Sequence, residues 1–478
     1  MPLLIALSGR PVPTAALRGQ PAWRGWRLGF TAGLIYFTGT LYWTSTVLST
    51  FGGVPIAAAI AAMLALAAYL AIFPACAAAL LGVSFARWGR AAFALVPAAW
   101  VGFEYLRGTL FGGFPWVPLG GSQVGVLPIA QLASVAGVYG LSALVTSISA
   151  LATYAFTTHG PAPMRALVAG AALVTATAGW GALRVADGGL TREGVPLRVG
   201  LVQGNVAQVD KWAPGEARRI FTTYLAMTRD AVRRGAEYVI WPESSTPFMF
   251  EEEAEGARAI RALVDEVGVP LLFGSDQFTR GTPPRLYNAA FSVVPGGATT
   301  VYRKMNLVPF GEFIPLQEWL SFVSPLVESA GHFSAGESMV LLPAGSESHR
   351  ISTAICYEAV FPWLAGAAVE AGSELLTTIT NDAWYGTSSA PYQHFALASM
   401  RAIEQGRYLA RSANTGISGV VDPYGRVVHA SALFTQVAVV EQVRLLKSRT
   451  VYSRIGDAVA QVSLVVVCAA LLALRRRA

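Results

Sequence analysis

Cys356 is the side chain in this sequence best suited to covalent chemistry. It stands in the stretch AICYEAVFP, at the end of an alternating apolar run and directly before Tyr357 and Glu358. A thiolate attacks acyl carbons to form a thioester, but it needs a base to accept its proton and a cation or dipoles to hold the oxyanion. The other two cysteines, Cys76 and Cys468, lie in long apolar runs, so we expect no disulfide framework.

Further polar groups stand at comparable positions and could supply the base and the cation. Glu243 follows the run VIWP, Lys304 follows TTVYR, and Asn381 and Asp382 follow LLTTIT. All of them end predicted strands, where the active groups of α/β sheets gather. A carboxylate is the expected base, because no histidine lies near Cys356 in the sequence.

Each of the three principal residues also has a structural interpretation when it is taken alone. Cys356 could be a small buried side chain, Glu243 an acid in the first turn of a helix, and Lys304 a solvated hairpin residue. The spacing of Glu243, Lys304 and Cys356 does not by itself separate these interpretations from catalysis.

The strand and helix signals that must position these groups alternate along residues 190–450. Period-two apolar runs predict strands over 197–206, 237–244, 269–276, 286–294, 299–304, 350–356, 374–382, 408–414 and 416–422. Amphipathic runs predict helices over 216–234, 254–267, 361–371 and 393–406. This alternation predicts one α/β domain of about 250 residues with a buried sheet.

The rest of the chain is much more apolar than this domain. Over the whole sequence 54% of residues are hydrophobic and 13% are charged, whereas soluble domains carry roughly 25% charged residues. A membrane span needs about 20 mostly apolar residues. Six segments are predicted as spans: 28–48, 54–82, 91–107, 128–157, 164–184 and 457–474. We therefore predict a transmembrane region over 1–186 and a C-terminal transmembrane helix over 457–474 with a basic tail.

Basic side chains favour one orientation of these segments, with one exception. Four arginines precede the first segment, two lie in the loop 83–91 and three lie at the end of the chain, whereas the loop 48–54 carries no charge. Cytoplasmic loops carry the excess of Lys and Arg. We therefore expect a cytoplasmic N-terminus and tail, with the domain 190–450 outside the cytoplasm. Arg107, at an outer end of a predicted span, does not fit this orientation.

The loop FGGFPWVPLGGSQ, residues 111–123, combines Gly, Pro and aromatic side chains and is too broken for a helix. It is expected at the membrane–water interface, where aromatic side chains gather. Two interpretations stay open: a connector with an aromatic belt, or part of a mouth through which lipids enter.

Two classes of function are not expected from the composition. The net charge is +7, but no basic helix with interleaved aromatics accompanies it, so we expect no nucleic-acid binding. No dense cluster of His, Cys and Asp has the spacing of metal ligands, so we expect neither a metal nor a dissociable cofactor.

Four motifs of the domain resemble the nitrilase superfamily: WPES (241–244), YRKMNLVPFGEFIP (302–315), ICYE (355–358) and NDAWYG (381–386). Together with the flanking membrane segments and LVPFGEFIP, they resemble the apolipoprotein N-acyltransferase family within that superfamily. The resemblance implies an α-helical transmembrane bundle joined to an extracytoplasmic α/β domain, a nitrilase-like α-β-β-α sandwich. Members of the family usually have eight spans, so we expect this chain to begin within the second of them.

The resemblance also implies roles for individual residues. Glu243 would be the general base, Lys304 the oxyanion stabiliser and Cys356 the nucleophile. Glu312 would be a second carboxylate that supports this triad, and Tyr357 and Glu358 would support the nucleophile from the positions beside it. Three aromatic residues would line the substrate region, with aromatic packing as the alternative: Trp212, Trp384 and Tyr385.

The activity implied by this resemblance is a two-step acyl transfer through a Cys thioester. The donor would be a membrane phospholipid, phosphatidylethanolamine in the family, and the acceptor the N-terminal amine of the diacylglyceryl-cysteine of an apolipoprotein. The enzyme would be a monomer in the bacterial inner membrane. Two alternatives stay open: a membrane-tethered amidase or nitrilase with water as acceptor, and a membrane scaffold with a dead domain.

Overall fold

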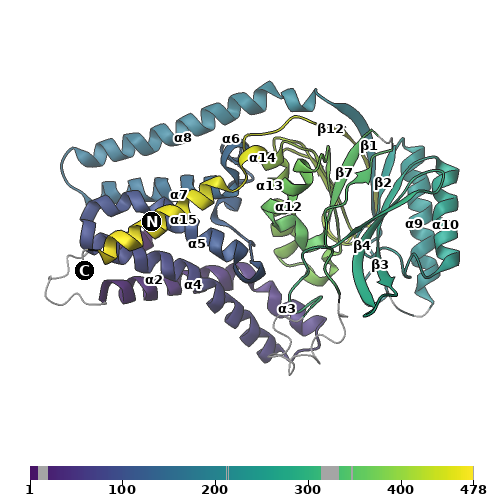
Figure 1. Ribbon diagram of the computed structural model, residues 1–478, viewed down its shortest axis with the longest axis horizontal. Helices are drawn as coiled ribbons and strands as arrows, with labels where there is room; N and C mark the ends of the chain where they lie inside the picture. The colour runs from purple at the N-terminus through teal and green to yellow at the C-terminus, as the bar shows by residue number, and fades with distance from the viewer. Residues whose placement is uncertain (9–19, 212, 214, 314–332, 346–347, 477–478) are drawn as a thin grey trace. The chain divides into compact units, whose positions relative to one another are not determined.

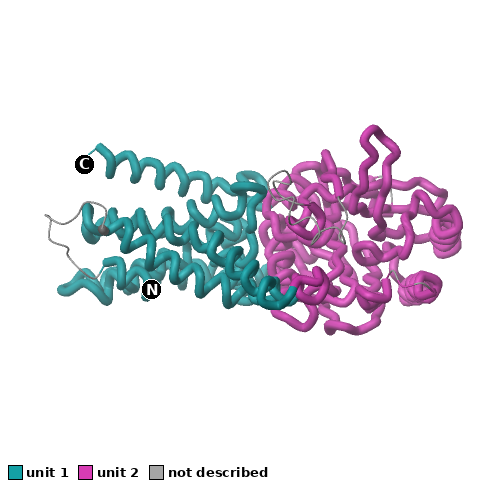
Figure 2. The backbone as a smooth tube through the Cα atoms, turned by 90° about the horizontal axis from the view of Figure 1, so that it is seen from below, with its two compact units in different colours: residues 1–46, 55–187, 450–478 teal, residues 47–54, 188–449 magenta. Residues whose placement is uncertain are grey.

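A computed structural model describes residues 1–8, 20–211, 213, 215–313, 333–345 and 348–476 (Figure 1). Trp212 therefore lies outside the described residues. Contacts between residues divide the chain into two compact units, which Figure 2 shows in different colours. The first unit comprises 1–46, 55–187 and 450–478, and the second comprises 47–54 and 188–449.

The first unit is built of helices. Their bounds are α1 Pro2–Ser8, α2 Gln20–Leu41, α4 Ile56–Trp88, α5 Val96–Thr109, α6 Leu127–Ala130, α7 Ala133–Thr157, α8 Ala162–Asp187, α14 Tyr452–Ile455 and α15 Ala458–Arg475. Helix α2 packs along α4, and α5 contacts α4, α7 and α15. Gly25 and Gly29 face α4, where an added Cβ would lie 2.3 Å from the Ala78 carbonyl oxygen or 2.6 Å from the Pro74 carbonyl oxygen. Small residues at this spacing allow two apolar helices to pack backbone against backbone.

Among the described residues, four helical stretches are long and apolar enough to cross a membrane: 56–112, 133–157, 162–191 and 458–475. The stretch 56–112 contains both α4 and α5, which the 3-10 helix η2 (Gly89–Leu95) separates. The predicted segment 28–48 is not one continuous helix, because α2 ends at Leu41 and α3 (Trp43–Thr50) begins two residues later.

The second unit contains two β-sheets. In the described residues each sheet has six strands, in the orders β12-β1-β2-β3-β4-β5 and β11-β10-β9-β8-β7-β6. The strands are β1 Val195–Gln203, β2 Tyr238–Ile240, β3 Leu271–Thr279, β4 Arg285–Val293, β5 Thr299–Arg303, β6 Leu342–Pro343, β7 Arg350–Ile355, β8 Leu376–Thr380, β9 Leu409–Ala413, β10 Gly419–Val421, β11 Val427–Ala430 and β12 Val437–Leu445. The sequence analysis did not predict β12, which pairs antiparallel with β1 along nine residues.

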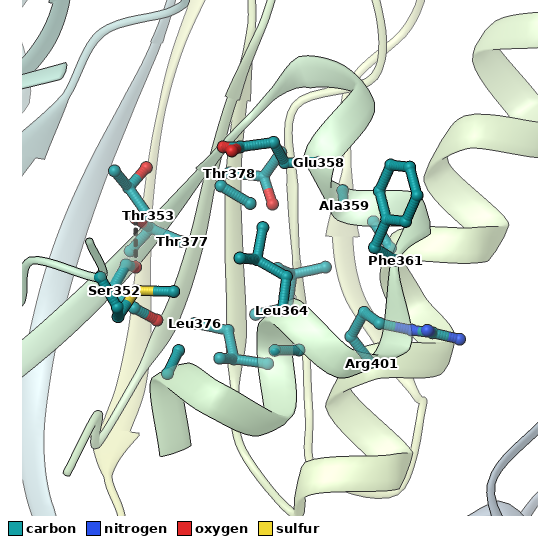
Figure 3. A pocket seen from close by; sticks show the side chains of 16 residues that line it. Ser352, Thr353, Glu358, Ala359, Phe361, Leu364, Leu376, Thr377, Thr378 and Arg401 are labelled. Atoms are coloured by element: carbon teal, nitrogen blue, oxygen red, sulfur yellow. Dashed lines mark hydrogen bonds between the residues drawn. The ribbon is translucent and has the colours of Figure 1, made fainter. Parts of the chain in front are cut away.

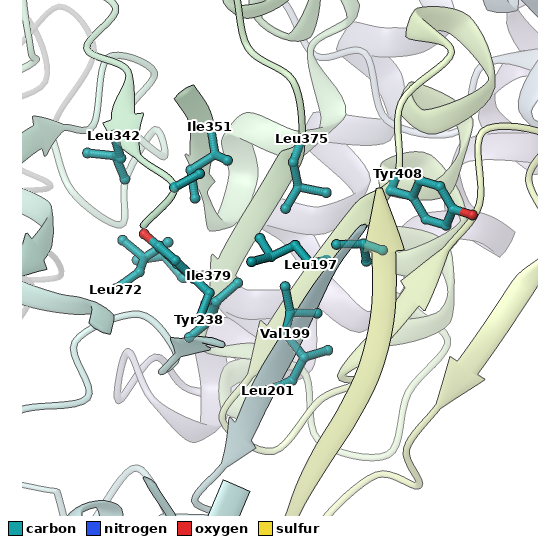
Figure 4. Packing of buried hydrophobic residues seen from close by; sticks show 14 of the residues in the cluster. Leu197, Val199, Leu201, Tyr238, Leu272, Leu342, Ile351, Leu375, Ile379 and Tyr408 are labelled. Atoms are coloured by element: carbon teal, nitrogen blue, oxygen red, sulfur yellow. The ribbon is translucent and has the colours of Figure 1, made fainter. Parts of the chain in front are cut away.

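The two sheets face one another across an apolar core, of which Figure 4 shows Leu197, Val199, Tyr238, Ile351 and Ile379. Helices α9 (Glu216–Arg233) and α10 (Ala254–Val267) cover the outer face of the first sheet. Helices α12 (Pro362–Glu370) and α13 (Ala390–Gln405) cover the second. Strands β8 and β9 are covered on both faces and buried at every position, although β8 carries three threonines and β9 carries Arg411 and Ser412. The predicted α-β-β-α sandwich is confirmed.

Candidate active site

Cys356 lies at the end of β7, where the strand turns into the short 3-10 helix η7 (Cys356–Val360). Its backbone adopts φ of 52°, and the residue is 7% exposed. A residue with a Cβ in this left-handed region costs about 1–3 kcal/mol and persists only where its surroundings hold it. Two other residues of the site region also have positive φ. Ser244 directly follows Glu243, and Phe310 lies two residues before Glu312. Strain of this kind gathers at functional sites.

Glu243 follows β2, and both of its carboxylate oxygens are bonded. Oε1 accepts a hydrogen bond from Asn288 Nδ2 at 2.8 Å, and Oε2 accepts one from the Asn381 backbone N–H at 2.9 Å. The neighbouring strand β3 carries Gly274, where an added Cβ would lie 2.6 Å from the Glu243 Cα. A glycine is therefore required for β3 to pass this close to the base.

Lys304 follows β5, and its side chain is 1% exposed. Its ammonium donates a hydrogen bond to Glu312 Oε1 at 2.8 Å and lies 3.7 Å from Glu243 Oε1. Asn288 also donates to Glu312 Oε1, at 2.9 Å, so it connects the two carboxylates. Burial lowers the pKa of Lys304, but the charges of Glu312 and Glu243 more than offset it and hold the pKa above its usual value. Lys304 is therefore a permanent buried cation.

Glu312 closes the turn that presents it to Lys304. Its Oε2 accepts a hydrogen bond from the Val308 backbone N–H at 2.8 Å, and its own N–H donates to the Val308 carbonyl at 2.9 Å. These two bonds between Glu312 and Val308 close the VPFGE turn. The remaining oxygen then faces the ammonium and Asn288.

The Cys356 thiol interacts electrostatically with both of the opposite charges. Burial raises its pKa, the Glu243 carboxylate raises it further, and the Lys304 ammonium lowers it. The net direction is upward, so the resting residue is a protonated thiol. A thiol in this state needs a base at the moment of attack, and Glu243 is the nearby anion that can accept the proton.

Glu358 connects the turn at Cys356 with the loop after Lys304 through hydrogen bonds. Its carboxylate accepts four hydrogen bonds of 2.7 to 3.1 Å, from the Tyr302 hydroxyl and the backbone N–H groups of Met305, Asn306 and Ile355. Figure 3 shows Glu358 at one end of a small cavity whose lining includes Leu364 and Leu376. Burial raises the pKa of Glu358 to about 7, against the effect of its backbone donors. Glu358 is thus a positioning residue for both loops.

The remaining aromatic residues predicted for the site differ in their surroundings. Tyr385 interacts electrostatically with Cys356, and burial raises its pKa well above the usual value. Trp384 is 37% exposed, and its ring lies 5.0 Å from that of Phe51. Tyr357 is buried, with its ring 5.0 Å from that of Phe361.

Several residues of the site were not predicted from the sequence. Asn288 is one, although a signal exists: it is the polar residue of LYNAAF on the face of β4 that also carries Ala290. Buried polar side chains on an inward face require partners, so this position could have been singled out. His394, which contacts the Cys356 carbonyl, and Arg411, which contacts His394, were not predicted either.

The arrangement as a whole is suited to acyl transfer. A thiol, a carboxylate and an ammonium lie together in a buried site, where charge interactions are stronger than in water. The ammonium can stabilise a developing oxyanion, and the carboxylate can carry a proton between the thiol and a leaving group. Hydrolysis and transfer to an amine begin with the same covalent step.

Comparisons with known proteins identify the families to which this chain is similar. Residues 198–445 match the family model described as carbon-nitrogen hydrolase, and residues 3–151 match the apolipoprotein N-acyltransferase N-terminal domain. The apolipoprotein N-acyltransferase of Geobacter metallireducens is 36% identical over 466 residues, 95% of this chain and 86% of the relative. The enzyme of that name from Methylococcus capsulatus is 35% identical, over 85% of this chain and 79% of the relative.

A solved structure is also similar to part of this chain. The crystal structure of an amidase from Nesterenkonia sp. covers 57% of this chain and 98% of its own, at 20% identity and a TM-score of 0.42.

Proposed function

This chain belongs to the apolipoprotein N-acyltransferase family, and on that premise we propose that it moves a fatty acyl chain from a membrane phospholipid to the N-terminal diacylglyceryl-cysteine of bacterial lipoproteins. The observation that carries the proposal is the buried group of Cys356, Glu243 and Lys304. It supplies a nucleophile, a base and a cation in one place.

The first half-reaction forms the acyl-enzyme. The Cys356 sulfur attacks the carbonyl carbon of the phospholipid ester while Glu243 accepts the thiol proton. Lys304 stabilises the negative charge on the carbonyl oxygen. The C–O bond then breaks, Glu243 returns the proton to the departing alkoxide, and a lysophospholipid leaves. A thioester on Cys356 remains.

The second half-reaction transfers the acyl chain. The free α-amine of the diacylglyceryl-cysteine attacks the thioester carbon, and Lys304 again stabilises the oxyanion. Glu243 accepts a proton from the amine. The C–S bond breaks, and that proton returns to the sulfur of Cys356. The products are an amide on the lipoprotein and the thiol enzyme, so protons and bonds balance over the cycle.

The apolar helices support lipid substrates. Removing an acyl chain from a bilayer costs about 0.8 kcal/mol per CH₂ group, so both substrates stay in the membrane and the active site must reach them there. The arginine pattern supports residues 190–450 on the extracytoplasmic side, and family membership supports the bacterial inner membrane as the location. Phosphatidylethanolamine as donor, a diacylated apolipoprotein as acceptor and a monomeric enzyme complete the proposal.

Mass spectrometry of the full chain tests this proposal. We expect incubation with phosphatidylethanolamine to leave a hydroxylamine-sensitive acyl adduct on the Cys356 peptide, and a diacylglyceryl-cysteine peptide to remove it as an N-acylated product. Cys356→Ala is the control and should carry no adduct. Release of free fatty acid alone, with no N-acylated peptide, would establish a hydrolase. Activity retained in Cys356→Ala would overturn covalent catalysis.

A further inference from the structure

A second buried polar cluster contacts the backbone of the nucleophile. It comprises His394 of α13, Asp382 of the 3-10 helix η8 (Asp382–Tyr385) and Arg411 of β9, whose side chains are 0% exposed. His394 Nε2 lies 2.9 Å from the carbonyl oxygen of Cys356. None of these three residues has a part in the proton transfers proposed above.

The contacts show that Nε2 of His394 carries a proton. A carbonyl oxygen only accepts, so Nε2 must donate its N–H to Cys356. Nδ1 lies 3.0 Å from both Arg411 Nη2, which only donates, and Asp382 Oδ1, which only accepts, so these two contacts call for opposite roles of Nδ1. Burial and Arg411 lower the pKa of His394 below its usual value, against the raising effects of Asp382 and the Cys356 carbonyl.

Asp382 holds Arg411 in place and also faces His394, with its Oδ1 3.0 Å from Nδ1. Its Oδ2 accepts a hydrogen bond from Arg411 Nη2 at 2.8 Å, and its Oδ1 accepts one from the Thr380 hydroxyl at 3.0 Å. Burial raises the pKa of Asp382, but Arg411 and His394 more than offset it and hold the pKa well below its usual value. Arg411 Nε also donates to the Ile417 carbonyl at 3.2 Å, which anchors the guanidinium from its other side.

The groups that face His394 come from every element around it. Arg411 and Asp382 face Nδ1, the Cys356 carbonyl faces Nε2, and the ring of Tyr385 lies edge-on at 6.3 Å between centroids. The imidazole therefore cannot turn without losing a hydrogen bond. Its donor stays aimed at one backbone oxygen.

We propose that His394 is a positioning residue, whose Nε2–H holds the Cys356 carbonyl so that the strained turn presents the sulfur to Glu243 and Lys304. The proposal rests on Cys356 being the nucleophile, as proposed above. A backbone at φ of 52° needs external restraint. The bond from His394 of α13 supplies it at the Cys356 carbonyl, and Glu358 holds the N–H of the preceding residue, Ile355. Displacement of a reacting atom by about 1 Å can cost 10²-fold in rate.

A matched pair of substitutions separates positioning from general stability. In His394→Gln the amide nitrogen takes the place of Nε2 and still donates to the Cys356 carbonyl. In His394→Asn the shorter amide takes the place of Nδ1, beside Asp382 and Arg411, and leaves the carbonyl without its donor. His349→Gln is the control, because His349 pairs with Glu374 at 2.6 Å outside the site.

The readouts are kcat and KM for acyl transfer by the full-length enzyme, together with the rate of Cys356 alkylation by iodoacetamide, followed on the Cys356 peptide. We expect His394→Asn to lower kcat about 100-fold with little change in KM. We expect His394→Gln to keep kcat within about tenfold of the parent, at a similar loss of thermal stability, and His349→Gln to leave kcat unchanged. The alkylation rates should fall in the same order.

Equal kcat values for the Gln and Asn variants would overturn the positioning role, as would a higher kcat for Asn. If His394→Asn does not fold, His394→Gln is compared with Arg411→Met instead. An equal reduction of kcat in these two variants also overturns the positioning role. Failure of the proposed function gives a different pattern, since the parent enzyme itself would then carry no acyl adduct on Cys356. An adduct that forms at the parent rate in His394→Asn overturns only the positioning role.

Discussion

The helical unit and the α/β unit both bury charged side chains, but they use them differently. In the helical unit Glu104 of α5 accepts hydrogen bonds from the Ser142 hydroxyl at 2.5 Å and the Leu119 backbone N–H at 2.7 Å. One turn further along α5, Arg107 Nη1 donates to the backbone carbonyls of Phe114 and Trp116 at 2.6 and 2.8 Å. These charges therefore hold the loop 111–123 by its backbone.

In the α/β unit the buried charges pair mainly with one another. Lys304 lies between the carboxylates of Glu312 and Glu243, and the Cys356 thiol interacts with both signs of charge. Glu104 and Arg107 bond the backbone of the loop 111–123, and no ionisable group is among the partners named for them above. A charge whose partners are other ionisable groups can exchange protons with them during a reaction. Glu243 also accepts a backbone N–H, so the presence of a nearby ammonium and thiol is what distinguishes it from Glu104.

The comparison also accounts for two features that the sequence left open. Arg107 did not fit the expected orientation, and the structure shows it 4% exposed and bonded to backbone carbonyls of the loop. The positive-inside rule describes basic residues in loops rather than one committed to such bonds. The loop itself is a fixed part of the helical unit, with Tyr36 also donating to the Val117 carbonyl at 3.0 Å.

The largest effect is expected at Cys356. Replacement by Ala removes the nucleophile, so acyl transfer should fall by about 10⁴-fold or more, as when a catalytic nucleophile is lost in other enzymes. The thermal midpoint should stay close to that of the parent, because the thiol contributes little packing. Acyl-transfer assays and thermal unfolding of the same preparations measure both. A large stability loss with residual transfer would place Cys356 among the structural residues.

The next effect is expected at Lys304. Lys304→Met removes the oxyanion donor and should lower kcat about 10²- to 10³-fold. It also leaves Glu312 and Glu243 facing each other without a cation, which should destabilise the fold by about 3–5 kcal/mol. Glu312→Gln serves as the comparison, since its amide oxygen can still accept from the ammonium. A Lys304→Met enzyme with the kcat of the parent would contradict the chemical role.

Arg107 should give the opposite pattern. Arg107→Met leaves the carbonyls of Phe114 and Trp116 without their donor, at about 1–3 kcal/mol for each buried group. We expect a lower thermal midpoint but an unchanged alkylation rate of Cys356 in the folded fraction. Arg165→Gln, an exposed position on α8, is the control. If Arg107→Met lost Cys356 reactivity at unchanged stability, Arg107 would not be a purely structural charge.

The smallest effect is a shift in the pH dependence of Cys356 alkylation. The pKa of the thiol lies above its ordinary value near 9, so the parent rate should still be rising above that pH. Glu243→Gln removes an anion that raises this pKa and leaves the lowering effect of Lys304. We therefore expect faster alkylation at pH 8 in Glu243→Gln, although acyl transfer falls. An unchanged alkylation profile would show that Glu243 does not act on the thiol.

Most elements of the α/β unit could be predicted because their signals are local. The helix α10 spans 254–267, as predicted, and β7, β8 and β9 lie within their predicted runs. The strand β12 was missed, although VAVVEQVRL has strand-forming residues, because its place beside β1 depends on a chain segment more than 200 residues away. The helical unit was predicted less well at its interruptions, such as the break between α2 and α3.

The sequence by itself determined where chemistry was possible, since strand ends and residue types are local properties. It placed Glu243, Lys304 and Cys356 after apolar runs, and its alternation of strand and helix patterns indicated the α/β fold. Only the tertiary structure decided the partners. The hydrogen bond from Asn381 to Glu243 joins residues 138 positions apart, and the one from His394 to Cys356 joins residues 38 apart. A hydrogen bond depends on distances of about 3 Å in space, which separation along the chain does not determine.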